Sequence, residues 1–236
     1  MYNRRMTGTL FIVSTPIGNM NDITLRAIET LKSVDLVVCE DSRLSGGLLH
    51  HLEIKKEMMV VNDVNEENKI YDVIEKLQNG LNLALISDAG TPLISDPGFK
   101  LVRECVKRNI TVVPIPGVSS IIAALSASAL PTDKFLFLGY SPDTDEKKKK
   151  WFLNIKSIVE TSNNAKMNPT IVFFESPHKF IRTLDAILET LGDIELVVAR
   201  EMTKIYEEFL RLTASDLKKH FEEHPPKGEF VILFKL

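Results

Sequence analysis

The stretch Asn82-Leu-Ala-Leu-Ile-Ser-Asp88-Ala-Gly90-Thr-Pro92-Leu-Ile-Ser-Asp96-Pro97-Gly98 joins a short apolar run to a loop rich in glycine, proline and aspartate. Such an uninterrupted apolar run is typical of a strand buried on both faces in a parallel sheet. A helical pattern follows at 97–108, and Asp96 and Pro97 suit its N-cap and first helical position. The stretch therefore predicts one strand–loop–helix unit of an α/β protein.

The same alternation extends over the first half of the chain. Strands are expected at Thr9–Thr15, Asp35–Glu40, Met58–Asn62, Asn82–Asp88 and Ile110–Ile115. Helices are expected at about 22–33, 42–52, 65–79, 97–108 and 118–129. Strands separated by helices indicate a parallel sheet, and ligand sites in such sheets lie at the carboxyl ends of the strands.

The second half of the chain has a different pattern. Strands are expected at FLFLGY, TIVFFES, ELVVARE, EEFLRLT and EFVILFKL, with helices near 144–163, 178–191 and 214–223. There is no room for a helix between every pair of strands, so this sheet should be mixed or antiparallel. We predict two α/β domains, with the boundary at Leu130-Pro131-Thr132-Asp133: an N-terminal, mostly parallel sheet flanked by helices (1–130) and a C-terminal mixed sheet with helices (131–236).

The composition is that of an ordinary globular protein. The chain has 236 residues, 29 Lys and Arg against 32 Asp and Glu, and a net charge of −3, so its bulk charge does not attract nucleic acid. No apolar run approaches the ~20 residues of a membrane span, and no signal-type segment follows the basic start. Cys39 and Cys105 lie inside apolar segments, which indicates buried, reduced thiols. We expect a soluble, cytoplasmic protein.

Three strand-end loops of the first half are candidates for ligand binding. Asp88 offers a carboxylate and Gly90 allows close approach of the backbone. In Pro116-Gly117-Val118-Ser119-Ser120 the serines would cap the next helix, and its free N–H groups would also accept an anion. Thr15-Pro16-Ile17-Gly18-Asn19 ends the first strand in a similar way. Neither the dinucleotide-binding nor the P-loop fingerprint occurs, so a nucleotide-like ligand would be held differently.

The second half offers polar groups without an assigned role. Glu175 and His178 follow a strand, and Ser176 and Pro177 between them suit a helix start. The stretch 199–204, AREMTK, is another polar strand end, for which surface ion pairing is the simpler interpretation. The run Lys147–Lys150 is most simply the solvated start of a helix. The five histidines suggest no metal site, and no nucleophile elbow is present.

Taken in order, eight segments resemble one family: VSTPIGNMNDITLRAIETL, CEDSR, NEEN, LISDAGTPLISDPG, PIPGVSSIIAALSASALPTDKFLF, FFESPHKFIRTL, AREMTKIYEEFLR and PPKGEFVI. The chain resembles the tetrapyrrole methylase-like (class III) S-adenosylmethionine-dependent methyltransferases, and within them the ribosomal RNA small subunit methyltransferase I group. The matching segments extend from about residue 10 to 235, and SDAGTPLISDPG followed by ALSASALPTD is a highly specific pair.

The resemblance implies a homodimeric two-domain methylase with no membrane partner, which binds S-adenosylmethionine in the cleft between its domains. The implied reaction methylates the ribose 2′-oxygen of a decoding-region cytidine in the 16S rRNA of the 30S subunit. Carried over by position, the expected cofactor contacts are Pro16, Asp88, Ala89, Gly90, Thr91, Ile94, Gly117, Ser119, Ser120 and Phe174.

Catalytic groups are suggested by the chemistry and by the implied cleft. The ribose hydroxyl is a poor acid, so a base or a group that stabilises the developing oxyanion would help. The candidates are Lys204, Glu201, Glu175 and Asp41, in that order. Arg43, Lys147, Lys148 and Arg200 could hold RNA phosphates.

Some segments depart from the pattern of the group. Asn62–Glu66 replaces a His-rich stretch, Ser42 stands where Thr is common, and Leu44–Gly47 replaces a more polar segment. Val118 follows Gly117 where Pro or Ala is common. The cofactor loops keep the pattern, so the RNA target is the part of the interpretation that these departures affect. Two alternatives stay open: methylation of a tetrapyrrole-like small molecule or a protein side chain, and a non-catalytic S-adenosylmethionine-binding module.

Overall fold

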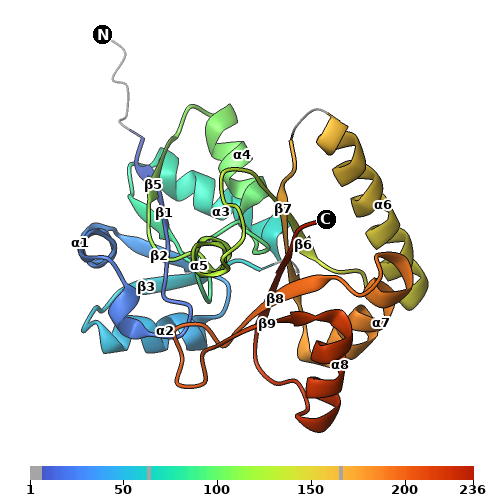
Figure 1. Ribbon diagram of the computed structural model, residues 1–236. Helices are drawn as coiled ribbons and strands as arrows, with labels where there is room; N and C mark the ends of the chain where they lie inside the picture. The colour runs from blue at the N-terminus through green and yellow to red at the C-terminus, as the bar shows by residue number, and fades with distance from the viewer. Residues whose placement is uncertain (1–6, 63–64, 165–166) are drawn as a thin grey trace. The chain divides into compact units, whose positions relative to one another are not determined.

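The structure, a computed structural model, describes residues 7–62, 65–164 and 167–236 (Figure 1). The chain divides into two compact units, Met1–Ser119 and Ser120–Leu236. This division falls before helix α5 (Ser120–Ala127), whereas the sequence placed the boundary after it. The reason is packing: α5 lies against strand β10 (Phe230–Phe234), which is part of the second unit. No helix among the described residues is long and apolar enough to cross a membrane.

The first unit is built on a parallel five-stranded sheet with the order β3-β2-β4-β1-β5. Its strands are β1 (Thr9–Val13), β2 (Leu36–Cys39), β3 (Glu57–Val60), β4 (Leu83–Leu85) and β5 (Thr111–Ile115). Its helices are η1 (Met20–Asp22), α1 (Leu25–Ser33), α2 (Ser42–His51), α3 (Glu66–Gln78) and α4 (Phe99–Lys107). The prediction of a parallel sheet with intervening helices is therefore confirmed.

Alternate residues of these strands enter two separate cores. Leu10, Val38 and Leu83 pack with α3 and α4, whereas Val13 and Val37 pack with α1 and α2 on the other face. Strands covered on both faces are apolar at consecutive positions, which is the pattern seen in the sequence. Cys39 and Cys105 are free and buried, one in each core, and burial raises the pKa of Cys105 to about 11.

Helix α4 begins later than predicted. Its N-cap is Gly98, which has a φ of 118°, and the helix starts at Phe99 rather than at Pro97. The preceding loop makes additional turns, with Leu93 and Ser95 at positive φ. A Cβ atom on Gly98 would lie 2.8 Å from Leu85 Cδ2, so only glycine fits this close, left-handed entry to the helix. The prediction that Asp96 caps α4 is therefore wrong.

The second unit has a mixed five-stranded sheet, as predicted, and its strand order is β6-β7-β10-β8-β9. β6 (Phe135–Tyr140) and β7 (Thr170–Glu175) are parallel, and the other pairings are antiparallel. The remaining strands are β8 (Glu195–Arg200) and β9 (Glu208–Thr213), and the remaining helices are α6 (Asp145–Asn164), η2 (Pro177–Lys179), α7 (Phe180–Thr190) and α8 (Ala214–Glu223).

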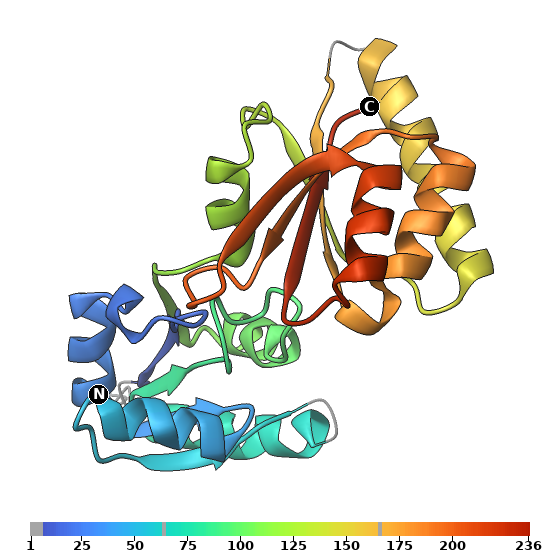
Figure 2. The same cartoon turned by 60° about the horizontal axis from the view of Figure 1, so that its bottom comes forward.

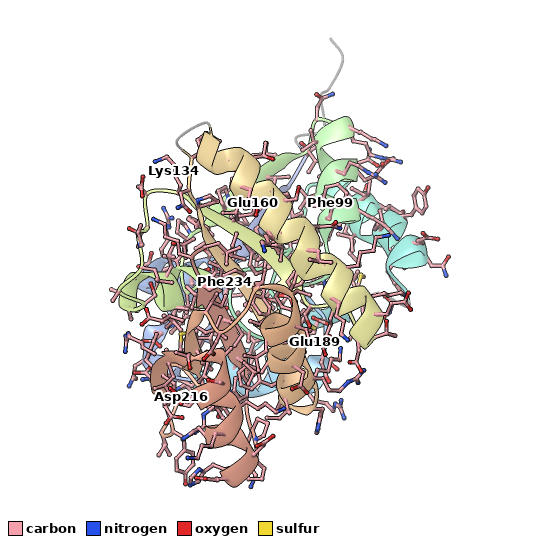
Figure 3. All side chains as sticks on the ribbon, turned by 45° about the vertical axis from the view of Figure 1, so that its right-hand side comes forward. Phe99, Lys134, Glu160, Glu189, Asp216 and Phe234 are labelled. Carbon is pink, nitrogen blue, oxygen red and sulfur yellow. The ribbon has the colours of Figure 1, made fainter. Side chains whose placement is uncertain are left out.

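The helices of this unit cover its sheet unequally. Figure 2 shows α6, α7 and α8 on one face and α5 on the other. The face under α6, α7 and α8 contains the main core, which includes Phe152, Phe173, Phe180 and Phe221. Figure 3 shows α6 and α7 side by side, with Glu160 and Glu189 labelled on them, and Glu189 forms an ion pair with Lys149 at 2.5 Å.

A fully buried ion pair joins α6 to the end of β7. The Nζ atom of Lys148 lies 2.8 Å from Oε2 of Glu175, and the two side chains are 0% and 1% exposed. Lys148 also donates to the hydroxyls of Ser141 (2.5 Å) and Thr183 (2.6 Å). Ser141 and Thr183 donate in turn to Glu175 Oε2. The second carboxylate oxygen, Oε1, accepts the N–H of Ser176 at 2.8 Å.

All polar groups of this cluster have partners, which is the condition for burying charge at tolerable cost. The three ammonium protons of Lys148 match three acceptors. Burial lowers the pKa of Lys148, while the hydrogen bond to Glu175 opposes that effect. The cluster takes one residue each from the segment after β6, from α6, from β7 and from α7, so it fixes the mutual positions of these four segments.

Removing one partner of this pair should destabilise the protein strongly. Lys148→Met leaves the Glu175 carboxylate buried without its counter-charge, and we expect a loss on the order of 3 kcal/mol in the free energy of unfolding, measured in urea. Lys150→Met, at an exposed position of the same lysine run, is the matched control and should change it by less than about 0.5 kcal/mol. The double variant Lys148→Met/Glu175→Leu should recover part of the loss. Equal stability of Lys148→Met and Lys150→Met would contradict this account.

Candidate functional site

Three loops at the carboxyl ends of β1, β4 and β5 are tied together in the first unit. Thr15 and Gly90 form an isolated antiparallel bridge: the Thr15 N–H donates to the Gly90 carbonyl at 2.8 Å, and the Gly90 N–H donates back at 3.1 Å. The Thr15 hydroxyl also donates to the Ser87 carbonyl at 3.2 Å. The bridge explains the buried polar residues at these strand ends, because their hydrogen-bonding groups have partners within the loops.

The third loop joins the other two through side chains. The Thr91 hydroxyl donates to the Val118 carbonyl at 2.9 Å, and it lies 3.1 Å from the Ser14 hydroxyl. A Cβ atom at Gly117 would lie 2.8 Å from Ser14 Cβ, so this loop approaches β1 more closely than another residue would allow. Gly90 has a φ of 84°, a backbone conformation that residues with a side chain rarely adopt. The three loops therefore form one preorganised rim.

Asp88 presents an exposed carboxylate on this rim. Its Oδ1 accepts the N–H of Asp41 at 3.2 Å, which joins the end of β2 to the loop after β4. Partial burial raises the pKa of Asp88, and the neighbouring Asp41 carboxylate adds to the effect. Asp41 itself accepts hydrogen bonds from the side chain and backbone of Arg43, and these hold its pKa at about 2. Asp41 is therefore ionised near neutral pH. The Asp88 carboxyl oxygens are able to accept a hydrogen bond from an ammonium or a hydroxyl group.

The other expected cofactor contacts differ in exposure. Ala89 and Gly117 are exposed, Ile94 is 45% exposed, and Pro16 is buried. Ser119 and Ser120 are half-buried at the start of α5. Gly90 is buried. The rim thus offers the Asp88 carboxylate, exposed backbone at Ala89 and Gly117 and the apolar side chain of Ile94.

In the second unit, Lys204 lies between two carboxylates. Its Nζ atom is 3.0 Å from Glu201 Oε1 and 3.0 Å from Glu229 Oε2. Glu201 Oε1 also accepts the Glu229 N–H at 3.0 Å. Burial lowers the pKa of Lys204, but the hydrogen bonds to Glu201 and Glu229 outweigh burial, so the pKa is raised overall. Lys204 is therefore a cation near neutral pH, which argues against its service as a proton acceptor.

The geometry at Lys204 is imposed by the backbone. Glu201 and Thr203 have φ values of 49° and 66°, in the left-handed region. A Cβ atom on Gly228 would lie 2.4 Å from Glu201 Oε1, so the turn before β10 must carry glycine for Glu201 to reach Lys204. The sequence analysis missed Glu229, because its contact with Lys204 joins two parts of the chain that are 25 residues apart.

Two expected site residues are corrected by their burial. Lys148 is 0% exposed and Glu175 is 2% exposed, and they bind each other. Lys148 therefore does not present its ammonium to RNA phosphates, and Glu175 is not a free catalytic carboxylate. A signal for this was present in the sequence, because Lys148 lies four residues before Phe152 and on the same stripe as Ile155 and Val159, all of which are buried.

The remaining predicted residues keep accessible side chains to different degrees. Arg43 is 89% exposed although it pairs with Asp41. Lys147 and His178 are exposed. Arg200 is 22% exposed and pairs with Glu208 at 3.0 Å. Phe174 is half-buried and makes ring contacts with Phe137 and Tyr140. Within residues 7–62, 65–164 and 167–236, no three His, Cys, Asp or Glu side chains form a group that could hold a metal ion.

Comparison with solved structures identifies the fold. Diphthine synthase superposes with a TM-score of 0.71 at 14% identity, over 96% of this chain and 89% of that one. Uroporphyrin-III-C-methyltransferase from Thermus thermophilus superposes with a TM-score of 0.64 at 20% identity, over 96% of this chain and 94% of that one.

Comparison of sequences identifies the family. The model of the Tetrapyrrole (Corrin/Porphyrin) Methylases matches residues 9–218. Ribosomal RNA small subunit methyltransferase I of Haemophilus influenzae is 46% identical over 97% of this chain and 78% of its own length. The protein of the same name from Thermotoga maritima is 42% identical over 96% of this chain and 97% of its own length. The chain belongs to the tetrapyrrole methylase family, in the group of the ribosomal RNA small subunit methyltransferase I proteins.

Proposed function

We propose that the chain transfers a methyl group from S-adenosylmethionine to the ribose 2′-oxygen of a cytidine in the 16S rRNA of the 30S subunit. The observation that carries the proposal is the tied rim of three strand-end loops, in a chain that matches small-subunit rRNA methyltransferases over nearly its whole length. The reaction takes place in the cytoplasm, where ribosomes are assembled, and the enzyme acts as a homodimer.

The rim residues would hold the methyl donor. S-adenosylmethionine supplies a methyl group on a sulfonium, which is already a good leaving group. Asp88 would accept a hydrogen bond from the ribose or the ammonium group of such a ligand, and the exposed backbone at Ala89 and Gly117 would allow its close approach, with the buried Gly90 fixing the loop through its bridge to Thr15. Pro16, Thr91, Ile94, Ser119 and Ser120 complete the proposed contact set.

Catalysis in this proposal depends mainly on positioning. Methyl transfer requires the attacking oxygen, the carbon and the sulfur to lie in line, and a preorganised rim supplies much of the rate by fixing one reactant. Lys204 is a cation with fixed partners, so its proposed role is to stabilise the developing 2′-oxyanion rather than to accept its proton. Glu201 holds Lys204 in place. Arg43, Lys147 and Arg200 are the proposed phosphate contacts.

The direct test is methyl transfer with labelled S-adenosylmethionine. We expect unmodified 30S subunits to be labelled in the ribose of one 16S cytidine, while total protein and precorrin-type substrates are not. The demethylated product should raise the melting temperature by mass action, and NAD, FAD and ATP should not do so comparably. Labelling of total protein or of a precorrin, and not of 30S subunits, would mean that the substrate is not RNA. Stabilisation by the product without labelling of any substrate would indicate a cofactor-binding module.

Removing the rim carboxylate should weaken cofactor binding selectively. Asp88→Ala is expected to raise the dissociation constant of S-adenosylhomocysteine at least about tenfold, or 1.4 kcal/mol, in calorimetric titration. Folding should survive, because the Asp88 side chain is exposed. Asp72→Ala removes an exposed carboxylate whose partner is Lys69 on the same helix, and it serves as the control with unchanged affinity. Normal affinity in Asp88→Ala would mean that the loop is only a structural turn.

Substitution of Lys204 separates catalysis from binding. Lys204→Ala should lower kcat for 30S subunits by roughly 10²-fold, because the cation next to the developing oxyanion is lost. The dissociation constant of the cofactor product should change less than about twofold. Lys204→Arg keeps the charge and should retain more activity than Lys204→Ala. If Lys204→Ala turns over at the wild-type rate, the lysine only pairs with Glu201 and Glu229, as surface ion pairs do.

A further inference from the structure

A β-bulge changes the direction of the side chains at the end of β6. Phe137 pairs with Val172 and Tyr140 pairs with Phe174, so three steps along β6 correspond to two steps along β7. Gly139, at the bulge, has a φ of 68°, and a Cβ atom added there would meet no heavy atom within 4 Å. Without the extra residue, Tyr140 would face the core side with Leu136 and Leu138. With it, Tyr140 shares a face with Phe137 and Phe174.

The result is a group of aromatic rings outside the main core of the second unit. The ring centroid of Phe174 lies 5.0 Å from that of Phe137 and 5.2 Å from that of Tyr140. Phe135, two residues before Phe137 on the same face, is 41% exposed, and Tyr140 is 59% exposed. We call Phe135, Phe137, Tyr140 and Phe174 the aromatic platform. α5 is on this face of the sheet too (Figure 2), where it packs against β10.

The platform is continuous along the chain with the buried polar cluster around Lys148. Ser141 directly follows Tyr140, and Glu175 directly follows Phe174. The Ser141 N–H donates to the Phe174 carbonyl at 3.2 Å. The side chains of Ser141 and Glu175 both belong to the buried cluster around Lys148. The buried charges therefore hold the backbone on which two of the rings stand.

The surrounding charges favour a stacking ligand over a phosphate backbone. Two cations that follow β7 in the chain are paired with acids that follow β6: Lys179 with Asp143, and Arg182 with Asp145 at 2.6 Å. Lys134, which precedes Phe135, is paired with Asp133 at 2.5 Å. Paired cations contribute little to counterion release, whereas exposed aromatic rings bind the π-face of any unpaired base. A protein partner is the alternative that the same exposed rings would allow.

We propose that the aromatic platform binds an unpaired base of the RNA substrate by stacking. The inference rests on the proposed function, because that function supplies the RNA. It assigns Phe174 to RNA binding rather than to the cofactor contacts suggested by the family resemblance. Lys148 and Glu175 act as positioning residues for the platform.

The test uses Tyr140 in the full-length protein, because Tyr140 is more exposed than Phe135. Tyr140→Ala should raise KM and the dissociation constant for 30S subunits about tenfold or more, the loss expected for one stacked base. The ratio of the dissociation constant of Tyr140→Ala to that of the wild type should be the same at low and high salt, because salt does not screen stacking. Tyr140→Phe should retain wild-type KM. The affinity for S-adenosylhomocysteine should change less than about twofold in both variants.

Tyr71→Ala is the matched control, because Tyr71 is a 64% exposed tyrosine on α3. It should leave KM for 30S subunits unchanged. Wild-type KM in Tyr140→Ala would overturn the proposal, and so would a loss that Tyr71→Ala shares. Weaker S-adenosylhomocysteine binding in Tyr140→Ala would assign the platform to the cofactor. A change in sedimentation that accompanies the loss would assign it to a protein interface.

Failure of the proposed function would be seen separately. Binding of 30S subunits by filter retention needs no methyl transfer. Wild-type protein that binds 30S subunits without methylating them would contradict the proposed reaction. The platform proposal would still be testable in that case, because it predicts weaker binding of 30S subunits by Tyr140→Ala. Wild-type protein that neither binds nor methylates 30S subunits would contradict both.

Discussion

The buried pair of Lys148 and Glu175 is the interaction around which the second unit is organised. Such pairs contribute little net stability, because the attraction between the charges is offset by the cost of removing them from water. They are nevertheless demanding in geometry, since each ammonium proton and each carboxylate oxygen must find a partner. Here Ser141, Thr183 and the Ser176 N–H meet that demand. Polar satisfaction, as well as packing, thus specifies the end of β7 and the chain that follows it.

In the first unit, the loop positions are fixed by uncharged groups instead of a buried ion pair. Parallel pairing of β1 with β4 and β5 brings three loops to one edge of the sheet, and backbone hydrogen bonds between Thr15 and Gly90 then lock two of them together. Glycine at positions 90 and 117 permits approaches that a side chain would prevent. The exposed Asp88 carboxylate lies on loops that are held by hydrogen bonds between uncharged groups. Such loops suit a rim that must accept a charged ligand without rearrangement.

The fold could be predicted from the sequence because local patterns carry it. Apolar runs and turn residues located the strands, and the shortage of helical segments in the second half indicated the mixed sheet. The prediction errors lie where the local structure depends on contacts between distant residues or on an unusual backbone conformation. The entry to α4 depends on Leu85 packing against Gly98. Within Lys147–Lys150, composition alone does not tell which side chain turns inward, although helical spacing from Phe152 singles out Lys148. The partner of Lys204 at Glu229 is far away in sequence.

The distribution of charge bears on how a chain of net charge −3 can act on RNA. Lys149 on α6, Lys179 in η2 and Arg182 on α7 each have an acidic partner, which weakens their attraction for phosphates, whereas Lys147 on α6 is exposed. Arg43 is a different case, since its side chain is 89% exposed while Asp41 holds it. Attraction from a distance is therefore weak, and recognition must come from contacts made after encounter. Stacking on a fixed aromatic surface is a contact of this kind, because it depends on shape and on an unpaired base rather than on net charge.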